Sequence, residues 1–219
     1  MVESSILFND PFKLLINDHD KVCQLFNTFK SVLSQQEKIR IIEQFITEIC
    51  IHSSIEERYV YPLITSKIRD SGAKMISDRN YLDHQQAKEV LQYFIDHMHT
   101  TLNMNANEQL LFNKTVEKFT MDLLDHMSEE EQFLFPKLST LLTQQEMSEL
   151  YSDLVRGKEN APTLPHPKTP MKTGTKLLHP ITGAMDKLMH IHGETKSASM
   201  EGPSESVHVT PTHQSGSCK

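Results

Sequence analysis

The sequence predicts an all-α protein: an up-down-up-down antiparallel four-helix bundle with a short fifth helix and a disordered C-terminal tail. Four stretches of roughly 25 residues carry apolar side chains at spacings of three and four, the period of a helix that buries one face. Short polar links join these stretches, so consecutive helices are expected to run antiparallel as neighbours. None of the four shows the strict alternation of apolar and polar residues that is typical of a strand.

The first predicted helix begins at Asp10-Pro11, because an aspartate side chain caps free amides and proline suits the first helical position. Its apolar stripe covers residues 12–33, and His19 lies within that stripe. The position of His19 predicts an imidazole that faces the bundle interior.

The second predicted helix follows the polar link at 34–36 and carries an apolar stripe over residues 39–64. His52 and Glu56 interrupt this stripe, and Pro62 is expected to kink or end the helix. Two polar groups in a core-facing stripe cost free energy unless partners satisfy them. The second helix therefore points to a polar site inside the bundle.

The third and fourth predicted helices repeat this arrangement. The third follows a break at 70–72 and carries its stripe over residues 81–102, with His84 inside it. A polar link at 103–107 leads to the fourth stripe, residues 112–141, which contains His126 and Glu130. Polar side chains thus interrupt the core-facing stripe of all four helices.

A fifth helix and a tail follow the bundle. Thr143 and Glu146 have the spacing of a capping box that opens the fifth helix, and Gly157 is expected to end it. We therefore predict one domain over residues 10–157. Proline, histidine, serine and threonine are frequent in residues 158–219, a composition that favours a mostly disordered tail.

An internal repeat relates the second helix to the fourth. Residues 52–62 and 126–136 each begin with a histidine, continue with two adjacent glutamates and two aromatic residues, and end with a proline. In both copies a glutamate stands four residues after the histidine, at Glu56 and at Glu130, so the two side chains share one face of a helix. An Asp-His pair precedes each copy, at His19 and at His84.

Folding as a bundle would bring six side chains from the four stripes together. They are four imidazoles and two carboxylates: His19, His52, Glu56, His84, His126 and Glu130. This donor set suits two metal ions, with iron favoured and manganese or zinc as alternatives, and it lacks the thiolates of an iron–sulfur cluster. The alternative is a buried polar network without metal, but burying so many polar groups without a cation would be costly.

Several neighbours of the six have more than one interpretation. Glu57 and Glu131 point about 140° from their histidines on an ideal helix. They are outer partners of the site, replacements for the neighbouring glutamate if the helix is distorted, or solvated residues or ion pairs between helices. Cys23 lies one turn after His19 and is either a redox-active thiol or a small packing residue. Four aromatic side chains are expected to wall the site and exclude water: Tyr59, Tyr61, Phe133 and Phe135.

Composition excludes several classes of function. The net charge of −7 gives no general attraction to nucleic acid, and no apolar run reaches membrane-spanning length. The three cysteines are odd in number and far apart, which favours a reducing compartment over a disulfide framework. No secretory signal is visible at the N-terminus, so we expect a cytoplasmic protein, with the nucleus as an alternative.

From Asp10 to about Gly157 the sequence resembles the hemerythrin HHE cation-binding family. The matching motifs are the Asp-His pairs at His19 and His84 and the His-x-x-x-Glu-Glu motifs that begin at His52 and His126. The segment 161–167, rich in proline, is also similar to the tail that follows the bundle in many such proteins.

The resemblance implies two irons, one held by His19 and His52 and one by His84 and His126. Two further ligands, Glu56 and Glu130, would bridge them. Oxygen-carrying members of the family have another histidine one turn after the third-helix ligand, where this chain has Lys88. That lysine either contacts a bound anion or peroxide, or extends to solvent.

Three functions are consistent with these features. The first is a non-haem di-iron protein that binds or senses oxygen, iron, nitric oxide or peroxide. The second is a di-iron enzyme that decomposes peroxide or oxidises a small substrate. The third is an interaction module with a structural metal, whose tail docks a protein partner. No nucleophile triad, phosphate-binding glycine loop or nucleotide fingerprint points to another enzyme class.

Overall fold

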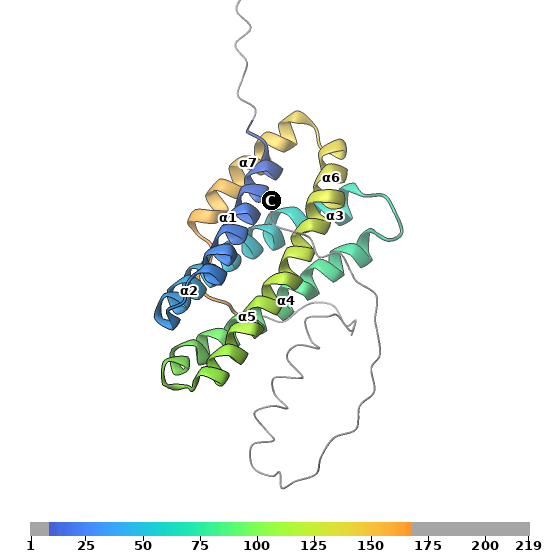
Figure 1. The fold of residues 1–219 in the computed structure, drawn as a ribbon. Helices are drawn as coiled ribbons and strands as arrows, with labels where there is room; N and C mark the ends of the chain where they lie inside the picture. Colours follow the sequence, from blue (N-terminus) through green and yellow to red (C-terminus); the bar gives the residue numbers. More distant parts are fainter. Residues whose placement is uncertain (1–8, 168–219) are drawn as a thin grey trace, which may run out of the picture.

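The computed structural model describes residues 9–167 and confirms the all-α class, with no strand in that range. The long rods of the bundle are α1, α2 continued by α3, α4, and α5 continued by α6 (Figure 1). The bounds of the helices are α1 Pro11–Ser31, α2 Gln35–Ile55, α3 Tyr61–Lys67, α4 Ala73–His97, α5 Ala106–Glu129, α6 Phe135–Leu141 and α7 Gln144–Glu159. Two π-helical turns, Glu56–Val60 and Glu130–Leu134, connect α2 to α3 and α5 to α6, and a 3₁₀ turn, Met98–Asn103, follows α4.

The predicted helix starts are confirmed in their details. The Asp10 carboxylate accepts a hydrogen bond from the Phe12 amide at 2.9 Å, and Pro11 takes the first helical position of α1. At α7 the capping box between Thr143 and Glu146 is complete in both directions. These contacts satisfy amides that have no partner within their helix.

The core consists of two apolar clusters that lie along the bundle on either side of one polar layer. On α1, Phe12 and Leu15 belong to one cluster, Val22 and Phe26 belong to the other, and His19 lies between them. The same order holds on the other rods, where the polar residues of the repeat separate the two sets of apolar side chains. The layer is therefore closed off from water at both ends by apolar packing.

Four residues of the predicted stripes prove to be exposed: Phe133, and Leu33, Leu102 and Leu141, each of which ends its stripe. Leu33 is 96% exposed because α1 ends at Ser31 and leaves Leu33 in the link. Phe133 is 70% exposed, so its expected place in the wall of the site is wrong. The π turn adds a residue to the helical turn and shifts the face that follows, so Leu134 and Phe135 are buried instead.

The helix α7 packs against α1 and α2, and its glycine has a role other than the predicted one. The helix continues through Gly157 to Glu159 instead of ending there. A Cβ at Gly157 would lie 2.6 Å from Cε2 of Tyr59, so the glycine permits close packing of α7. Beyond α7, Pro165 is buried and the Pro167 carbonyl accepts a hydrogen bond from Gln85.

The predicted disordered tail, apart from its first residues, lies outside the described residues, at 168–219. Within residues 9–167, no helix is both long enough and apolar enough to cross a membrane.

Candidate metal centre

The structure brings all six predicted site residues together in the polar layer. His19 comes from α1, His52 from α2, His84 from α4 and His126 from α5. Glu56 and Glu130 open the two π turns; all six side chains are at least nine-tenths buried.

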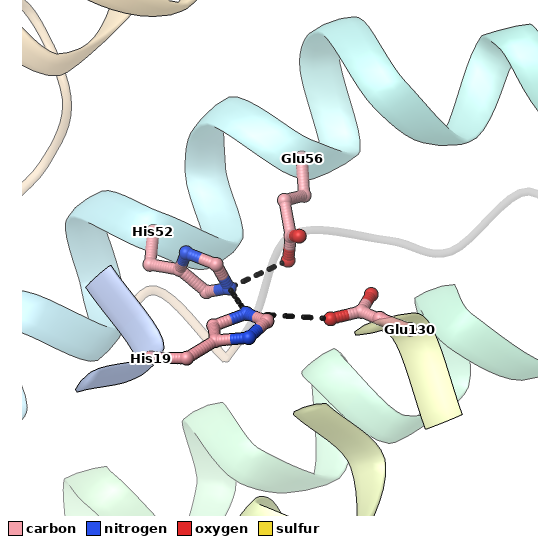
Figure 2. A group of neighbouring side chains, drawn as sticks. All are labelled: His19, His52, Glu56 and Glu130. Carbon is pink, nitrogen blue, oxygen red and sulfur yellow. Dashed lines mark hydrogen bonds and ion pairs between the residues drawn. The ribbon is translucent and has the colours of Figure 1, made fainter. Parts of the chain in front are cut away.

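Four of these residues form a compact donor group, in which one ligand atom from each lies within 4.8 Å of the others (Figure 2). The Nε2 atoms of His19 and His52 are 3.1 Å apart, and His52 Nε2 is 3.0 Å from Oε2 of Glu56. Oε2 of Glu130 reaches His19 Nε2 at 3.7 Å from the opposite side of the bundle.

The other two histidines meet the same glutamates. His84 Nε2 lies 3.6 Å from Oε2 of Glu56, and His126 Nε2 lies 3.5 Å from Oε1 of Glu130. The hydroxyl of Tyr61 lies among these groups, 2.8 Å from His84 Nε2 and 3.0 Å from Oε1 of Glu130. Each glutamate therefore reaches one histidine of each pair, which is the arrangement that bridging carboxylates require.

The two π turns place the glutamates. The amide of Tyr61 donates to the carbonyl of Glu56, and the amide of Phe135 donates to the carbonyl of Glu130, five residues back in each case. Single π turns are frequent at functional sites because they reorient side chains without ending the helix. Both copies of the sequence repeat contain a π turn at the same position.

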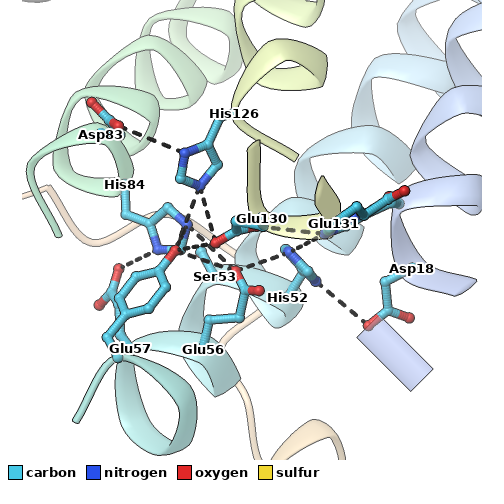
Figure 3. A network of polar contacts seen from close by, with 12 residues as sticks. Asp18, His52, Ser53, Glu56, Glu57, Asp83, His84, His126, Glu130 and Glu131 are labelled. Carbon is cyan, nitrogen blue, oxygen red and sulfur yellow. Dashed lines mark hydrogen bonds and ion pairs between the residues drawn. The ribbon is translucent and has the colours of Figure 1, made fainter. Parts of the chain in front are cut away.

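Four further carboxylates surround the histidines on the side away from the centre, and we call them the carboxylate ring (Figure 3). Each member contacts the Nδ1 atom of a histidine on another rod, which leaves the Nε2 atom facing the centre. The contacts are Glu131 to His19 at 2.7 Å, Glu57 to His84 at 3.2 Å, Asp18 to His52 at 3.6 Å and Asp83 to His126 at 3.6 Å. The hydrogen bonds from Glu131 and Glu57 orient His19 and His84 and favour the tautomer with a proton on Nδ1. Asp18 and Asp83 lie too far from Nδ1 of His52 and His126 for a hydrogen bond and act on these imidazoles through their charge.

The ring settles what several neighbouring side chains contact. Glu57 is an outer partner of His84 and also an ion-pair partner of Lys88, at 2.7 Å from its Nζ. Lys88 therefore neither faces the centre nor extends freely to solvent. Cys23 packs against the apolar cluster that contains Phe26, as the packing interpretation expects.

Two ring members, Asp18 and Asp83, were not identified as site residues from the sequence. Each stands directly before a histidine of the site, and this shared Asp-His pair was the available signal. The aspartate does not serve its own neighbour but the histidine of the next rod. The ε-ammonium of Lys158 on α7 also pairs with Asp18, which connects the fifth helix to the ring.

Burial and opposite charges set the protonation of the centre. Burial opposes charge on His52 and His126, but the nearby carboxylates of Glu56 and Glu130 outweigh it and raise their pKa values to about 10 and about 9. Burial also disfavours the Glu56 carboxylate, yet the charge of His52 lowers its pKa. Burial and the charge of Glu56 together raise the pKa of Glu130.

The donors fit a metal cation. Among the described residues, Oε1 of Glu56 and Oε2 of Glu130 are buried acceptors without a hydrogen-bond partner. Buried acceptors of this kind are costly in a dry layer and indicate a missing partner. Imidazole nitrogen with carboxylate oxygen is a donor set for iron, manganese or zinc, and binding would displace the protons that His52 and His126 hold.

Comparisons with known proteins agree with this centre. No solved structure matches the chain. An uncharacterised hemerythrin-like protein of Schizosaccharomyces pombe (strain 972 / ATCC 24843) is 30% identical over 158 residues, which cover 72% of this chain and 73% of that protein. The family model of the hemerythrin HHE cation binding domain matches residues 10–154, which include every residue of the centre and the ring. This chain therefore belongs to the hemerythrin HHE cation-binding domain family.

Proposed function

We propose that this cation-binding domain holds two irons and that its centre binds dioxygen, nitric oxide or peroxide, which makes the protein a sensor or handler of these molecules or of iron itself. His19 and His52 would hold one iron, and His84 and His126 the other. Glu56 and Glu130 would bridge them. The observation that carries the proposal is that each glutamate contacts one histidine of each pair inside a layer closed by apolar packing.

Iron in such a site would supply a redox change and coordination positions for a small molecule. The chain's own contribution is to aim four Nε2 atoms inward, to hold the two carboxylates between them, and to exclude bulk water. The carboxylate ring supports this role because Glu131 and Glu57 hold the imidazoles of His19 and His84 from outside by hydrogen bonds.

A route for small molecules supports the proposal further. An open pocket of about 360 Å³ reaches Glu130 from the protein surface. Four apolar side chains line it, Ile68, Ile76, Phe133 and Leu134, and the other lining residues include Arg79, Asn80 and Lys137. A neutral diatomic molecule fits a partly apolar pocket whose lining includes Glu130.

The test is the metal content of protein purified without oxygen, followed by absorption spectra before and after exposure to oxygen or nitric oxide. We expect about two irons per chain, as the two histidine pairs imply, and a new charge-transfer absorption after exposure. His52→Ala should lower the iron content, while His99→Ala should not, because the His99 side chain is 61% exposed and lies outside the polar layer. Stable, metal-free wild-type protein would contradict the proposal.

The same pocket favours one second candidate, a di-iron enzyme that decomposes peroxide or oxidises a small substrate. A volume of about 360 Å³ admits more than a diatomic molecule. Peroxide consumption by iron-loaded protein, compared with His52→Ala at equal free iron, would show turnover. Binding without turnover would leave the first function.

A further inference from the structure

The two halves of the centre differ at one repeated position. Tyr61 stands nine residues after His52, and Phe135 stands nine residues after His126. Both residues follow a π turn, both precede a proline, and both are buried at 2% exposure or less. Tyr61 and Phe135 thus occupy the same position of the repeat, and only Tyr61 carries a side-chain oxygen.

Phe135 has no polar atom and only packs beside His19. Its ring stacks on His19 with centroids 5.8 Å apart and an interplanar angle of 25°. It also stacks on Phe12 at 5.3 Å. The half of the centre that His19 and His52 form therefore gains no donor atom from this position.

Tyr61 contributes an oxygen to the other half. Its Oη atom lies 2.8 Å from His84 Nε2 and 3.5 Å from His126 Nε2, and the ring centroids of Tyr61 and His84 are 5.0 Å apart. The same oxygen lies 3.0 Å from Oε1 of Glu130 and 3.4 Å from Oε2 of Glu56. Four predicted ligand atoms thus surround one phenol oxygen.

These separations are those expected between ligands of one ion. Donor atoms about 2.0–2.1 Å from a metal are about 2.9 Å apart at right angles and about 3.4 Å apart at tetrahedral angles. The four distances from Tyr61 Oη, between 2.8 and 3.5 Å, span this interval. A cation among His84, His126 and the glutamates would therefore have the Tyr61 oxygen as a neighbour.

We propose that Tyr61 is a ligand of the metal held by His84 and His126, and that the metal held by His19 and His52 has no counterpart because Phe135 occupies that place. The inference rests on the proposed metal centre. On binding, an oxygen–metal bond replaces the phenol O–H bond, and the proton is released to solvent. An exogenous small molecule then binds at the metal of His19 and His52, which has one protein ligand fewer.

The experiment is optical and resonance Raman spectroscopy of the full chain loaded with two ferric ions. Tyrosinate bound to ferric iron gives visible charge-transfer absorption and enhanced phenolate ring vibrations. Tyr61→Phe should lose both signals and keep its helical circular dichroism. Tyr81→Phe is the matched control, because the half-buried Tyr81 hydroxyl donates to the Glu57 carbonyl at 2.8 Å instead. This variant should keep both signals.

Each outcome separates this inference from the proposed function. Two bound irons without a tyrosinate signal in the wild type, or a signal that persists in Tyr61→Phe, would overturn the role of Tyr61 and leave the iron centre intact. Failure to bind iron at all would contradict the proposed function itself. If Tyr61→Phe does not fold, the wild type is labelled with ring-deuterated tyrosine instead. The enhanced vibrations must shift on labelling, and an unshifted spectrum would refute the assignment of Tyr61 as a ligand.

Discussion

The contact between Glu131 and His19 gives the sharpest test of the carboxylate ring. Glu131→Gln keeps the size and the hydrogen-bonding carbonyl of the side chain but removes the charge that faces His19 Nδ1 at 2.7 Å. The neutral amide can still accept the Nδ1 proton, but it stabilises the imidazole less well as a metal ligand. We therefore expect weaker metal binding by a folded protein.

The structure bounds the size of this effect. Loss of an outer partner of a metal ligand costs about tenfold to a hundredfold in metal affinity. The short contact favours the upper part of that interval, but the Glu131 side chain is 37% exposed, so water screens its charge. We expect a loss of about tenfold, which corresponds to about 1.4 kcal/mol.

The assay is competition for ferrous or zinc ions against a chelator of known affinity, with fold checked by circular dichroism. The matched control is Glu129→Gln, the same change two residues earlier, where the side chain is 54% exposed and pairs with Arg79 instead of a histidine. Equal losses of metal affinity in the two variants would mean that the effect comes from removing one negative charge anywhere near the centre. That result would refute the assignment of Glu131 as an outer partner of the ligand.

Three further outcomes are expected. Gly157→Ala should destabilise the protein by up to about 2 kcal/mol in denaturant unfolding, because crowding Tyr59 at 2.6 Å and Ile55 at 3.1 Å costs more than the helix gains from alanine. Hydrogen bonds from Lys67 and Thr143 lower the pKa of Glu146 to about 2, so its stabilisation is complete above about pH 4.5 and is lost as the pH falls toward 2; Glu146→Gln should remove this part of the pH dependence of unfolding. Metal removal should lower the free energy of unfolding by about 3 kcal/mol relative to protein at roughly a hundredfold excess of metal over its Kd.

Each of these outcomes has its own control. Gly72→Ala meets only Asp70 Oδ1 at an ordinary 3.4 Å, so it should lack the crowding cost of Gly157→Ala. Glu149→Gln changes an exposed carboxylate of the same helix α7 and should leave the acid limb unchanged. Readdition of metal must restore the unfolding midpoint, and a midpoint indifferent to metal would contradict the link between binding and folding.

The sequence was sufficient for the architecture because its signals are local. Asp10 with Pro11 and Thr143 with Glu146 act within one helical turn, and the apolar stripes need only the helical period. The repeat from His52 and from His126 likewise predicted which six side chains share the polar layer. Ligation of metal by these six remains a prediction, which their convergence supports.

What the sequence did not reveal depends on a change of helical phase or on contacts between rods. An ideal helix buries Phe133, and only the π turn exposes it. The outer roles of Asp18 and Asp83 require knowledge of which rod lies beside which histidine. Gly157 was taken for a helix end because glycine commonly ends helices, whereas here the approach of Tyr59 selects it.

The contacts of the carboxylate ring are of two kinds, within a helical hairpin and between the two hairpins. Asp18 reaches His52 and Asp83 reaches His126, so each aspartate acts within one helical hairpin. Glu57 and Glu131, in contrast, act across the two hairpins.

Each hairpin therefore has one ring glutamate and one histidine that find no ring partner within the same hairpin. A second hairpin, related to the first by a half rotation, supplies the histidine for that glutamate and the glutamate for that histidine. The chain therefore has the connectivity of an isologous dimer fused into one polypeptide. Two chains could exchange hairpins without losing a single link of the ring, and the two halves of a chain cut between α3 and α4, in the segment 68–72, have the contacts needed to reassemble.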